Sequence, residues 1–254
     1  MAATPAPRFT ARSLTFLRAL KRHNDREWFR ARRDEYETHV RGPLVAIIER
    51  LAVDFRAFAP EMVADPKVST YRIYRDTRFS ADKSPLKTHV AGVFPDRRLG
   101  KGAGAALYFH VGPDEMWIGG GLYHPDTSKL HTVREHLASN FTRFRSVVRA
   151  PAFRKTFKDV EGERLQRVPR GFAADHAAAE YLKLRDFLVG ADFPPAFATN
   201  ARFYRTLVAT FKQATPFVRF INEALVAPKP REAFWENVDI LQSARGPAPT
   251  RSRR

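Results

Sequence analysis

The apolar residues of this chain change their spacing twice, and no other feature limits the fold as strongly. Between residues 16 and 55 they recur every three or four positions, which predicts helices. Between residues 68 and 123 they alternate with polar residues over short runs, which predicts strands. Helical spacing returns after Pro125. Helices, then strands, then helices predict an α+β fold with a mostly antiparallel sheet of about four or five strands packed against several helices.

The expected helices have recognisable start and stop signals. Asn24 is the expected N-cap of the second helix, because Glu27 three residues later could complete a capping box. Gly42 and Pro43 are expected to break that helix and start the next, since proline lacks the N–H that a helix interior needs. The later helices are expected over residues 130–148, 177–189 and 197–226, with an interruption at Pro216 in the last one.

Strands are expected over residues 68–75, 89–94, 105–111 and 116–123. The turn at residues 112–115 should join the last two into a hairpin. Three consecutive glycines, Gly119 to Gly121, lie in the returning strand. Glycine weakens a strand, so this run predicts a bulge or a close approach of backbone.

The composition is consistent with one domain over residues 10–227, because 44% of the 254 residues are hydrophobic and no internal repeat or linker is visible. Residues 1–9 are expected to be a disordered tail and residues 228–254 a second tail rich in proline and arginine. The N-terminus has no acidic residue before Asp25, so a mitochondrial-type transit peptide is the alternative reading of that end.

Several classes of site are excluded by the residues that the sequence lacks. The chain contains no cysteine, which rules out disulfides, thiolate zinc sites and cysteine nucleophiles. Its eight histidines have no metal-ligand spacing, and neither a P-loop nor a GxSxG motif is present, so we expect no metal site. No apolar run approaches the ~20 residues of a membrane-spanning helix. We therefore expect a cytoplasmic protein without membrane contact.

The formal net charge is +17, and the segment 228–254 contributes only +3 of it. Such an excess favours polyanionic partners: nucleic acid, phosphorylated small molecules or an acidic protein surface. The charge is densest in YRIYRDTRFSADKSPLK at residues 71–87, where five cationic side chains face only Asp76 and Asp82.

Residues of this segment can converge on an anion because the chain bends after its strand-like start. Arginine binds phosphate or carboxylate through two parallel N–H bonds, and lysine adds a point charge. The candidate ligand-binding residues here are Arg75, Arg78, Ser80, Lys83 and Lys87. The alternative is a solvated loop whose acids pair internally with its bases.

Asp76 and Asp82 are the candidate catalytic residues, and they could also simply orient the cations. Asp76 would serve as a general base if an apolar wall raised its pKa. Trp28 is either a core residue or the wall of a binding cleft. Lys183 and Arg185 either add to the anion site or are solvated helix charges.

Several stretches resemble the family catalogued as domain of unknown function 2461, in order over about residues 10–190. They are Phe16 with Leu20, Asn24, Trp28 and Phe29; RDTRFSADKSPLK at 75–87; GGGLYHP at 119–125; and Pro169, Gly171 and Phe172 with His176 and LKLRDF at 182–187. Leu86 stands where the family often has an aromatic residue. The family carries no established activity, so the resemblance implies a shared site around 75–87 and no mechanism.

The leading hypothesis is a site for a phosphorylated or carboxylated small molecule, with catalysis as an extension of it and no cofactor identified. Nucleic-acid binding through the basic surface is the alternative, although no helix-turn-helix, zinc-finger or RNP signature is present. A third reading is a module that binds an acidic protein. The small anion is placed first because the charge is focused within bends and is not spread along one helix.

Overall fold

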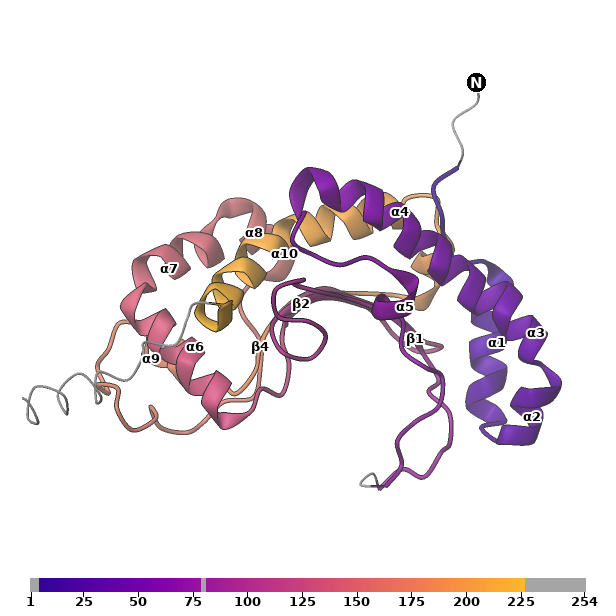
Figure 1. The fold of residues 1–254 in the computed structure, drawn as a ribbon, viewed down its shortest axis with the longest axis horizontal. Helices are drawn as coiled ribbons and strands as arrows, with labels where there is room; N and C mark the ends of the chain where they lie inside the picture. Colours follow the sequence, from indigo (N-terminus) through magenta and orange to yellow (C-terminus); the bar gives the residue numbers. More distant parts are fainter. Residues whose placement is uncertain (1–4, 79–80, 227–254) are drawn as a thin grey trace, which may run out of the picture.

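The computed structural model describes residues 5–78 and 81–226, which form a four-stranded antiparallel sheet with helices on one of its faces (Figure 1). The strands lie in the order β1-β2-β3-β4. Their bounds are β1 (Val90–Pro95), β2 (Ala106–Val111), β3 (Met116–Leu122) and β4 (Phe187–Phe193). The predicted α+β class with an antiparallel sheet is confirmed.

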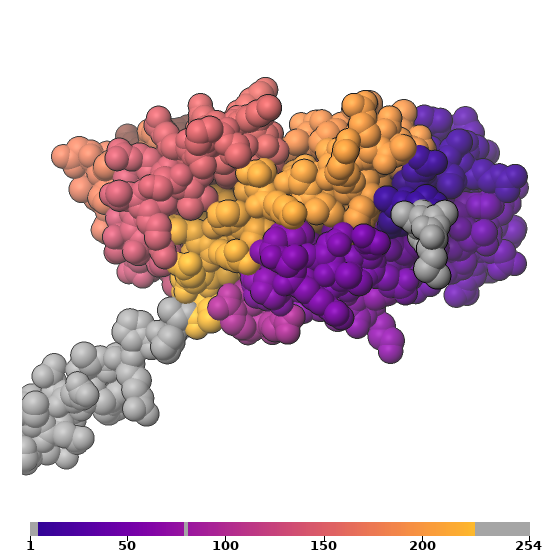
Figure 2. Space-filling view, turned by 90° about the horizontal axis from the view of Figure 1, so that it is seen from above, coloured from indigo at the N-terminus to yellow at the C-terminus, as the bar shows by residue number. Residues whose placement is uncertain are grey.

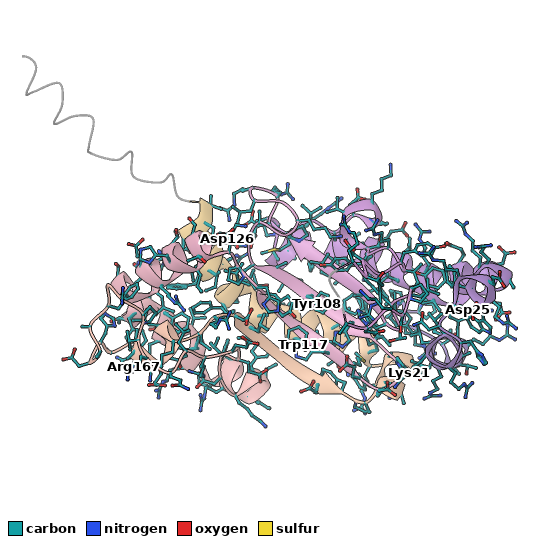
Figure 3. The ribbon with its side chains drawn as sticks, turned by 90° about the horizontal axis from the view of Figure 1, so that it is seen from below. Lys21, Asp25, Tyr108, Trp117, Asp126 and Arg167 are labelled. Atoms are coloured by element: carbon teal, nitrogen blue, oxygen red, sulfur yellow. The ribbon has the colours of Figure 1, made fainter. Side chains whose placement is uncertain are left out.

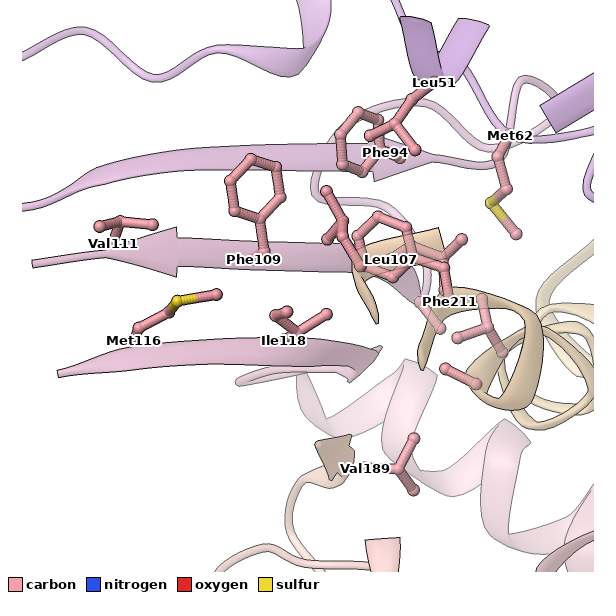
Figure 4. Packing of buried hydrophobic residues seen from close by; sticks show 14 of the residues in the cluster. Leu51, Met62, Phe94, Leu107, Phe109, Val111, Met116, Ile118, Val189 and Phe211 are labelled. Atoms are coloured by element: carbon pink, nitrogen blue, oxygen red, sulfur yellow. The ribbon is translucent and has the colours of Figure 1, made fainter. Parts of the chain in front are cut away.

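Two long helices, α4 (Gly42–Phe58) and α10 (Phe203–Val226), lie side by side over one face of the sheet (Figure 2). The core fills the space between them and the strands. Phe94 and Phe109 point from the sheet towards Phe211 of α10, with ring centroids 5.5 and 6.5 Å away (Figure 4). Phe55 of α4 reaches the same cluster, 5.2 Å from Phe94. Aromatic burial of this kind dominates the packing energy of a core.

The N-terminal helices differ from expectation at both of the predicted signals. The elements are α1 (Ala11–Arg22), α2 (Arg26–Ala31), α3 (Arg33–Tyr36) and the π-helical turn η1 (Glu37–Arg41), which runs directly into α4. Asp25, and not Asn24, caps α2 by accepting a hydrogen bond from the N–H of Trp28 at 2.7 Å. Pro43 starts α4 as expected, but the chain stays helical through Gly42, so the predicted break is wrong.

The expected strand over residues 68–75 is also wrong. The short helix α5 (Pro66–Ser69) takes its first residues, and Asp65 caps that helix by accepting from the N–H of Lys67 at 2.7 Å. The following residues make only isolated bridges, Thr70 with Gly92 and Tyr74 with Leu86. An Asp-Pro start signal therefore overrides the alternating pattern at this point.

Helices return after β3 as α6 (Thr127–Ser139), α7 (Phe141–Arg149) and α8 (Pro151–Phe157). The expected single helix over residues 130–148 is broken at Asn140, whose backbone φ is −121° and whose side chain donates to the carbonyl of His136 at 2.9 Å. Asparagine competes with the helix for backbone groups in this way, whereas apolar periodicity alone does not reveal the interruption.

The expected helix over residues 177–189 is replaced by the short α9 (Ala179–Leu182) and the edge strand β4. Phe187 and Val189 are buried beneath the helices. Their spacing of two fits a strand, just as the spacing of four between other apolar residues in this stretch fitted the predicted helix. The short 3₁₀ helix η2 (Pro195–Thr199) follows. Helix α10 passes through Pro216 without the expected interruption, held by its buried face.

The two expected tails are described only in part. Phe9 is buried and packs against Phe203, with ring centroids 6.0 Å apart. Residues 228–254 lie outside the described residues. Within the described ranges, no helix combines the length and the apolar character that crossing a membrane requires.

Candidate functional site

The face of the sheet opposite α4 and α10, called the open face below, carries a group of aromatic side chains. Tyr108 and His110 alternate along β2 with the buried Phe109, so they point away from the helices. Trp117 of β3 lies opposite His110 in the strand register and therefore shares its face. Figure 3, seen from the side opposite the helices, shows Tyr108 and Trp117 near the middle of the molecule.

Two glycines make room for the indole of Trp117. A Cβ atom at Gly190 would lie 2.0 Å from the indole ring, and one at Gly119 would lie 2.7 Å from it and 2.0 Å from the carbonyl oxygen of Val189. Gly119 and Gly190 are partners in the register of β3 and β4. The indole thus occupies the space that two side chains would otherwise fill, and the close approach predicted for the glycine run occurs at Gly119.

Four rings follow one another across the open face and are called the ring row. Trp117 lies 6.0 Å from Tyr108, Tyr108 lies 5.7 Å from His110, and His110 lies 5.5 Å from His89, measured between ring centroids. Burial raises the pKa of Tyr108 and lowers the pKa of His110. Burial, with the neighbouring charges of His110 and Lys87, lowers the pKa of His89 to about 4. Both histidines are therefore neutral at pH 7.

Lys87 and Lys101, called the lysine pair, lie over the same phenol ring. Their Nζ atoms are 4.8 and 4.1 Å from the centroid of Tyr71. Lys101 also donates to the carbonyls of Val68 and Thr70 at 2.8 and 2.9 Å. Burial lowers the pKa of each lysine, and so does neighbouring positive charge: that of Arg72 and Arg75 for Lys87, and that of Lys87 for Lys101. Across residues 5–78 and 81–226, neither lysine forms an ion pair with a carboxylate.

A narrow recess lies between Lys87 of the lysine pair and His89 of the ring row. It is lined in part by Tyr71, Lys87 and His89, together with Ala91 of β1. Ala91 lies opposite His110 in the register of β1 and β2, so the recess opens at the edge of the ring row. The backbone of Lys87 is held there because its backbone N–H donates to the carbonyl of Ile73 at 2.8 Å.

The charged side chains of the predicted loop pair mainly with one another. Arg78 donates from Nε and Nη2 to the two carboxylate oxygens of Asp76 at 3.0 and 2.7 Å. Arg75 donates to Asp82, and Nζ of Lys83 donates to the carbonyl of Thr77 at 3.0 Å. Ser80 lies outside the described residues.

These pairs change the chemistry that the two aspartates offer. The hydrogen bond from Arg78 lowers the pKa of Asp76 to about 2, and hydrogen bonds from Ser84 and Arg75 lower the pKa of Asp82 to about 2. Asp76 is exposed and its pKa is lowered, so the raised pKa that a general base would need is not found here. Both carboxylates are positioned to hold arginines.

The three remaining candidates lie apart from the lysine pair. Trp28 packs against Phe16 and stacks on His23, with ring centroids 5.6 and 5.7 Å away. Lys183 pairs with Glu180 at 2.6 Å and Arg185 with Glu163 at 3.0 Å, at the α9 end of the molecule (Figure 1). Of the sequence-predicted residues that the structure describes, only Lys87 lies in the site, with Arg75 close enough to affect its pKa.

Sequence reasoning missed the ring row and one half of the lysine pair. Tyr108 and His110 could have been found, because residues two apart in a predicted strand share a face. Trp117 could have been paired with them through the predicted hairpin. Lys101 gives no such signal, since it reaches Tyr71 from a loop between β1 and β2.

Two further stretches of the chain meet at the far end of β3. The N–H of His124 donates to Oδ1 of Asp186 at 2.7 Å, and the ring Nδ1 of His124 lies 3.6 Å from the same oxygen. Asp186 is buried just before β4, and the N–H of His124 gives its carboxylate a hydrogen-bond donor.

In the part of the chain that the structure describes, no group of three or more metal-ligating side chains could hold a metal ion.

Comparison with known proteins gives one match. Residues 12–220 match the model of a protein family described as Conserved hypothetical protein (DUF2461). The match includes the lysine pair and the ring row. No curated protein and no solved structure matches the chain.

Proposed function

Because the chain belongs to the DUF2461 family, whose description names no activity, we propose a function from the site itself: the lysine pair binds a small phosphorylated or carboxylated anion. One observation carries this proposal. The ammonium groups of the half-buried Lys87 and the exposed Lys101 lie over a single tyrosine ring, and no carboxylate in the described residues pairs with either of them. Elsewhere on this protein, cations next to carboxylates form ion pairs readily.

The electrostatics of the lysine pair favour an anion. Removing an ammonium group from water costs free energy, and a second like charge adds repulsion, which is why the pKa of both lysines is lowered. A bound anion would offset both effects, because an opposite charge favours the charged form of each lysine. Each charge-assisted hydrogen bond contributes roughly 1.5–3 kcal/mol. Two of them, less the lost freedom of the ligand, correspond to weak or moderate affinity.

The loop cations have a supporting role in this proposal. Arg75 is already paired with Asp82 and Arg78 with Asp76, so an anion bound by these arginines would compete with the two carboxylates. A guanidinium has five N–H donors, however, and Arg75 keeps donors available beyond its contact with Asp82. We assign Asp76 and Asp82 to orienting these arginines, because carboxyl groups with a pKa of about 2 make poor proton acceptors at neutral pH.

Titration calorimetry with inorganic phosphate tests the proposal. The Lys87→Gln, Lys101→Gln double variant should lose about tenfold or more in affinity, the equivalent of at least one charge-assisted bond. The matched control is Lys129→Gln, Lys183→Gln, which removes the same charge from lysines paired with Asp126 and Glu180. Equal losses in the two double variants would show that only net charge matters and would overturn the proposal.

Nucleic acid is the second candidate, and the net charge of +17 favours it. Binding of this kind releases counterions, so affinity for a single strand should fall steeply as salt rises, with a slope set by the phosphates engaged. A small anion at two lysines should show a shallow slope. Titrations of a short oligonucleotide and of phosphate at several salt concentrations separate the two.

A further inference from the structure

The lysine pair and the ring row meet at one edge of the open face. Tyr71, which lies under both lysines, lines the same recess as His89. His89 begins the ring row, which continues through His110 and Tyr108 to Trp117 with centroid separations of 5.5 to 6.0 Å. An anion held by the lysines would therefore have a row of neighbouring rings beside it.

The open face also carries small residues beside Trp117. Its neighbours there include Gly119 and Gly190, where any Cβ would collide with the indole or the backbone. Ala91 of β1 is the residue opposite His110. Trp117 is only partly buried, so its large ring beside two glycines on the open face is the feature to explain.

We propose that the anion is the phosphate of a nucleotide unit, whose base stacks on Trp117 and Tyr108 while the lysine pair holds the phosphate. This inference rests on the proposed function and specifies its ligand class. Bases stack on aromatic side chains whatever their sequence, because every base presents a flat π-face. Cationic side chains beside such rings complement the phosphate. The neutral His110 and His89 lie between the two ends, with ring planes tilted by 49° to each other.

The same chemistry has two sources, a free nucleotide and one unit of a single strand. Four probes separate them: adenosine 5′-monophosphate, ribose 5-phosphate, adenosine and a short single-stranded oligoadenylate. The base should make adenosine monophosphate bind about tenfold tighter than ribose 5-phosphate, in keeping with the contribution of one stacked base. Oligoadenylate that binds more tightly still, with a steep salt dependence, identifies the strand as the source; equal affinity identifies the free nucleotide.

Two variants test where the base and the phosphate of the ligand bind. Trp117→Leu should remove the advantage of adenosine monophosphate over ribose 5-phosphate and leave ribose 5-phosphate binding unchanged. Lys87→Gln, Lys101→Gln should weaken both ligands. Trp28→Leu is the matched control, since Trp28 packs on α1 away from the open face and should change neither affinity. Tyr108→Leu, which should lower the same advantage, serves as the second variant if Trp117→Leu does not fold.

The outcomes distinguish failure of this inference from failure of the proposed function. If both phosphates bind with equal affinity and remain sensitive to the lysines, the nucleotide assignment is wrong and the anion site stands. If neither phosphate binds in a lysine-dependent way, both proposals are wrong. If the advantage of the base persists in Trp117→Leu and in Tyr108→Leu, the ring row is not its binding surface and the inference is overturned.

Discussion

The side-chain amide of Asn24 pairs with both backbone groups of Leu86. Nδ2 of Asn24 donates to the carbonyl of Leu86 at 2.9 Å, and Oδ1 accepts from its N–H at 3.0 Å. Asn24 follows α1, whereas Leu86 is buried near the end of the charged segment 71–87. The contact thus fixes the residue immediately before Lys87, one half of the lysine pair.

Replacement of Asn24 by alanine should therefore loosen the loop. Leu86 would keep a buried N–H and carbonyl without partners, which costs about 1–3 kcal/mol of unfolding free energy. Urea unfolding measures the loss, and hydrogen exchange should show faster exchange of the Leu86 amide. Asp25→Ala is the control: it removes the N-cap of α2, at a cost of about 1 kcal/mol, and should leave the Leu86 amide protected. Unaltered exchange in Asn24→Ala would contradict the assignment.

Asn24 also shows what a sequence can and cannot specify. Its position before Asp25 and Glu27 fits an N-cap, and the local rule gave the wrong partner because the true one lies 62 residues away. The same reason explains the other errors. Residues 68–75 and 177–189 carry periodicities that fit more than one structure, and only their neighbours in the fold decide between them. The hairpin of β2 and β3, which depends on local turn chemistry, was predicted correctly.

The candidate site, like the fold, was only partly predictable from the sequence. The density of charge over residues 71–87 indicated the segment that contains Lys87, whose ammonium group lies over Tyr71. Whether a cation is available depends on which carboxylate it meets, and Arg75, Arg78 and Lys183 meet theirs through side-chain geometry that spacing does not show. Lys101 joins Lys87 only because the turn after β1 folds back over Tyr71.

Gly190 and Gly119 should respond differently to a methyl group. The three atoms nearest to a Cβ at Gly190 all belong to the Trp117 indole, whereas a Cβ at Gly119 also meets the carbonyl oxygen of Val189 at 2.0 Å. Each alanine substitution should cost about 1–3 kcal/mol of unfolding free energy in the wild-type background. In a Trp117→Leu background, Gly190→Ala should lose most of its cost and Gly119→Ala should retain it. Urea denaturation of the two double-mutant cycles measures both; equal coupling would contradict the packing described here.

The neutral state of His89 predicts how stability depends on pH. Its pKa is lowered from 6.5 to about 4 in the folded chain, chiefly by burial, with His110, Lys87 and Arg75 acting in the same direction and Glu115 opposing them. As the pH falls below 6.5, the unfolded chain takes up a proton that the folded chain does not. Titration of His89 therefore leaves the free energy of unfolding unchanged above pH 6.5 and lowers it as the pH falls from 6.5 to about 4. The total decrease from this residue is at most about 3 kcal/mol.

His89→Gln should flatten this decline, as measured by urea unfolding across that pH interval. His110 contributes in the same direction because burial lowers its pKa too, so part of the slope will remain. His124→Gln is the matched control, since its side chain is 63% exposed and lies outside the ring row. A decline of equal steepness in His89→Gln and in the wild-type protein would show that His89 is not the group responsible.

The carbonyl of His39 has a donor from outside its own helix. Pro43 stands four residues later and has no N–H to donate, and Oγ of the buried Ser13 donates to that carbonyl instead, at 2.5 Å. The adjacent π-helical turn, closed by the bond from the N–H of Gly42 to the carbonyl of Glu37, lets the helix pass the proline ring. Ser13 therefore joins α1 to the start of α4.

Ser13→Ala should leave the His39 carbonyl without a partner and cost about 1–3 kcal/mol of unfolding free energy. Pro43→Ala restores an N–H at the position from which an α-helix would supply this bond. In that background the cost of Ser13→Ala should be smaller, by about 1 kcal/mol, because the restored backbone N–H at position 43 can donate to the His39 carbonyl. Thr10→Ala is the control, since Thr10 caps α1 through Ser13 without contacting His39. Additive effects of Ser13→Ala and Pro43→Ala in urea unfolding would mean that the hydroxyl does not replace the missing helical bond.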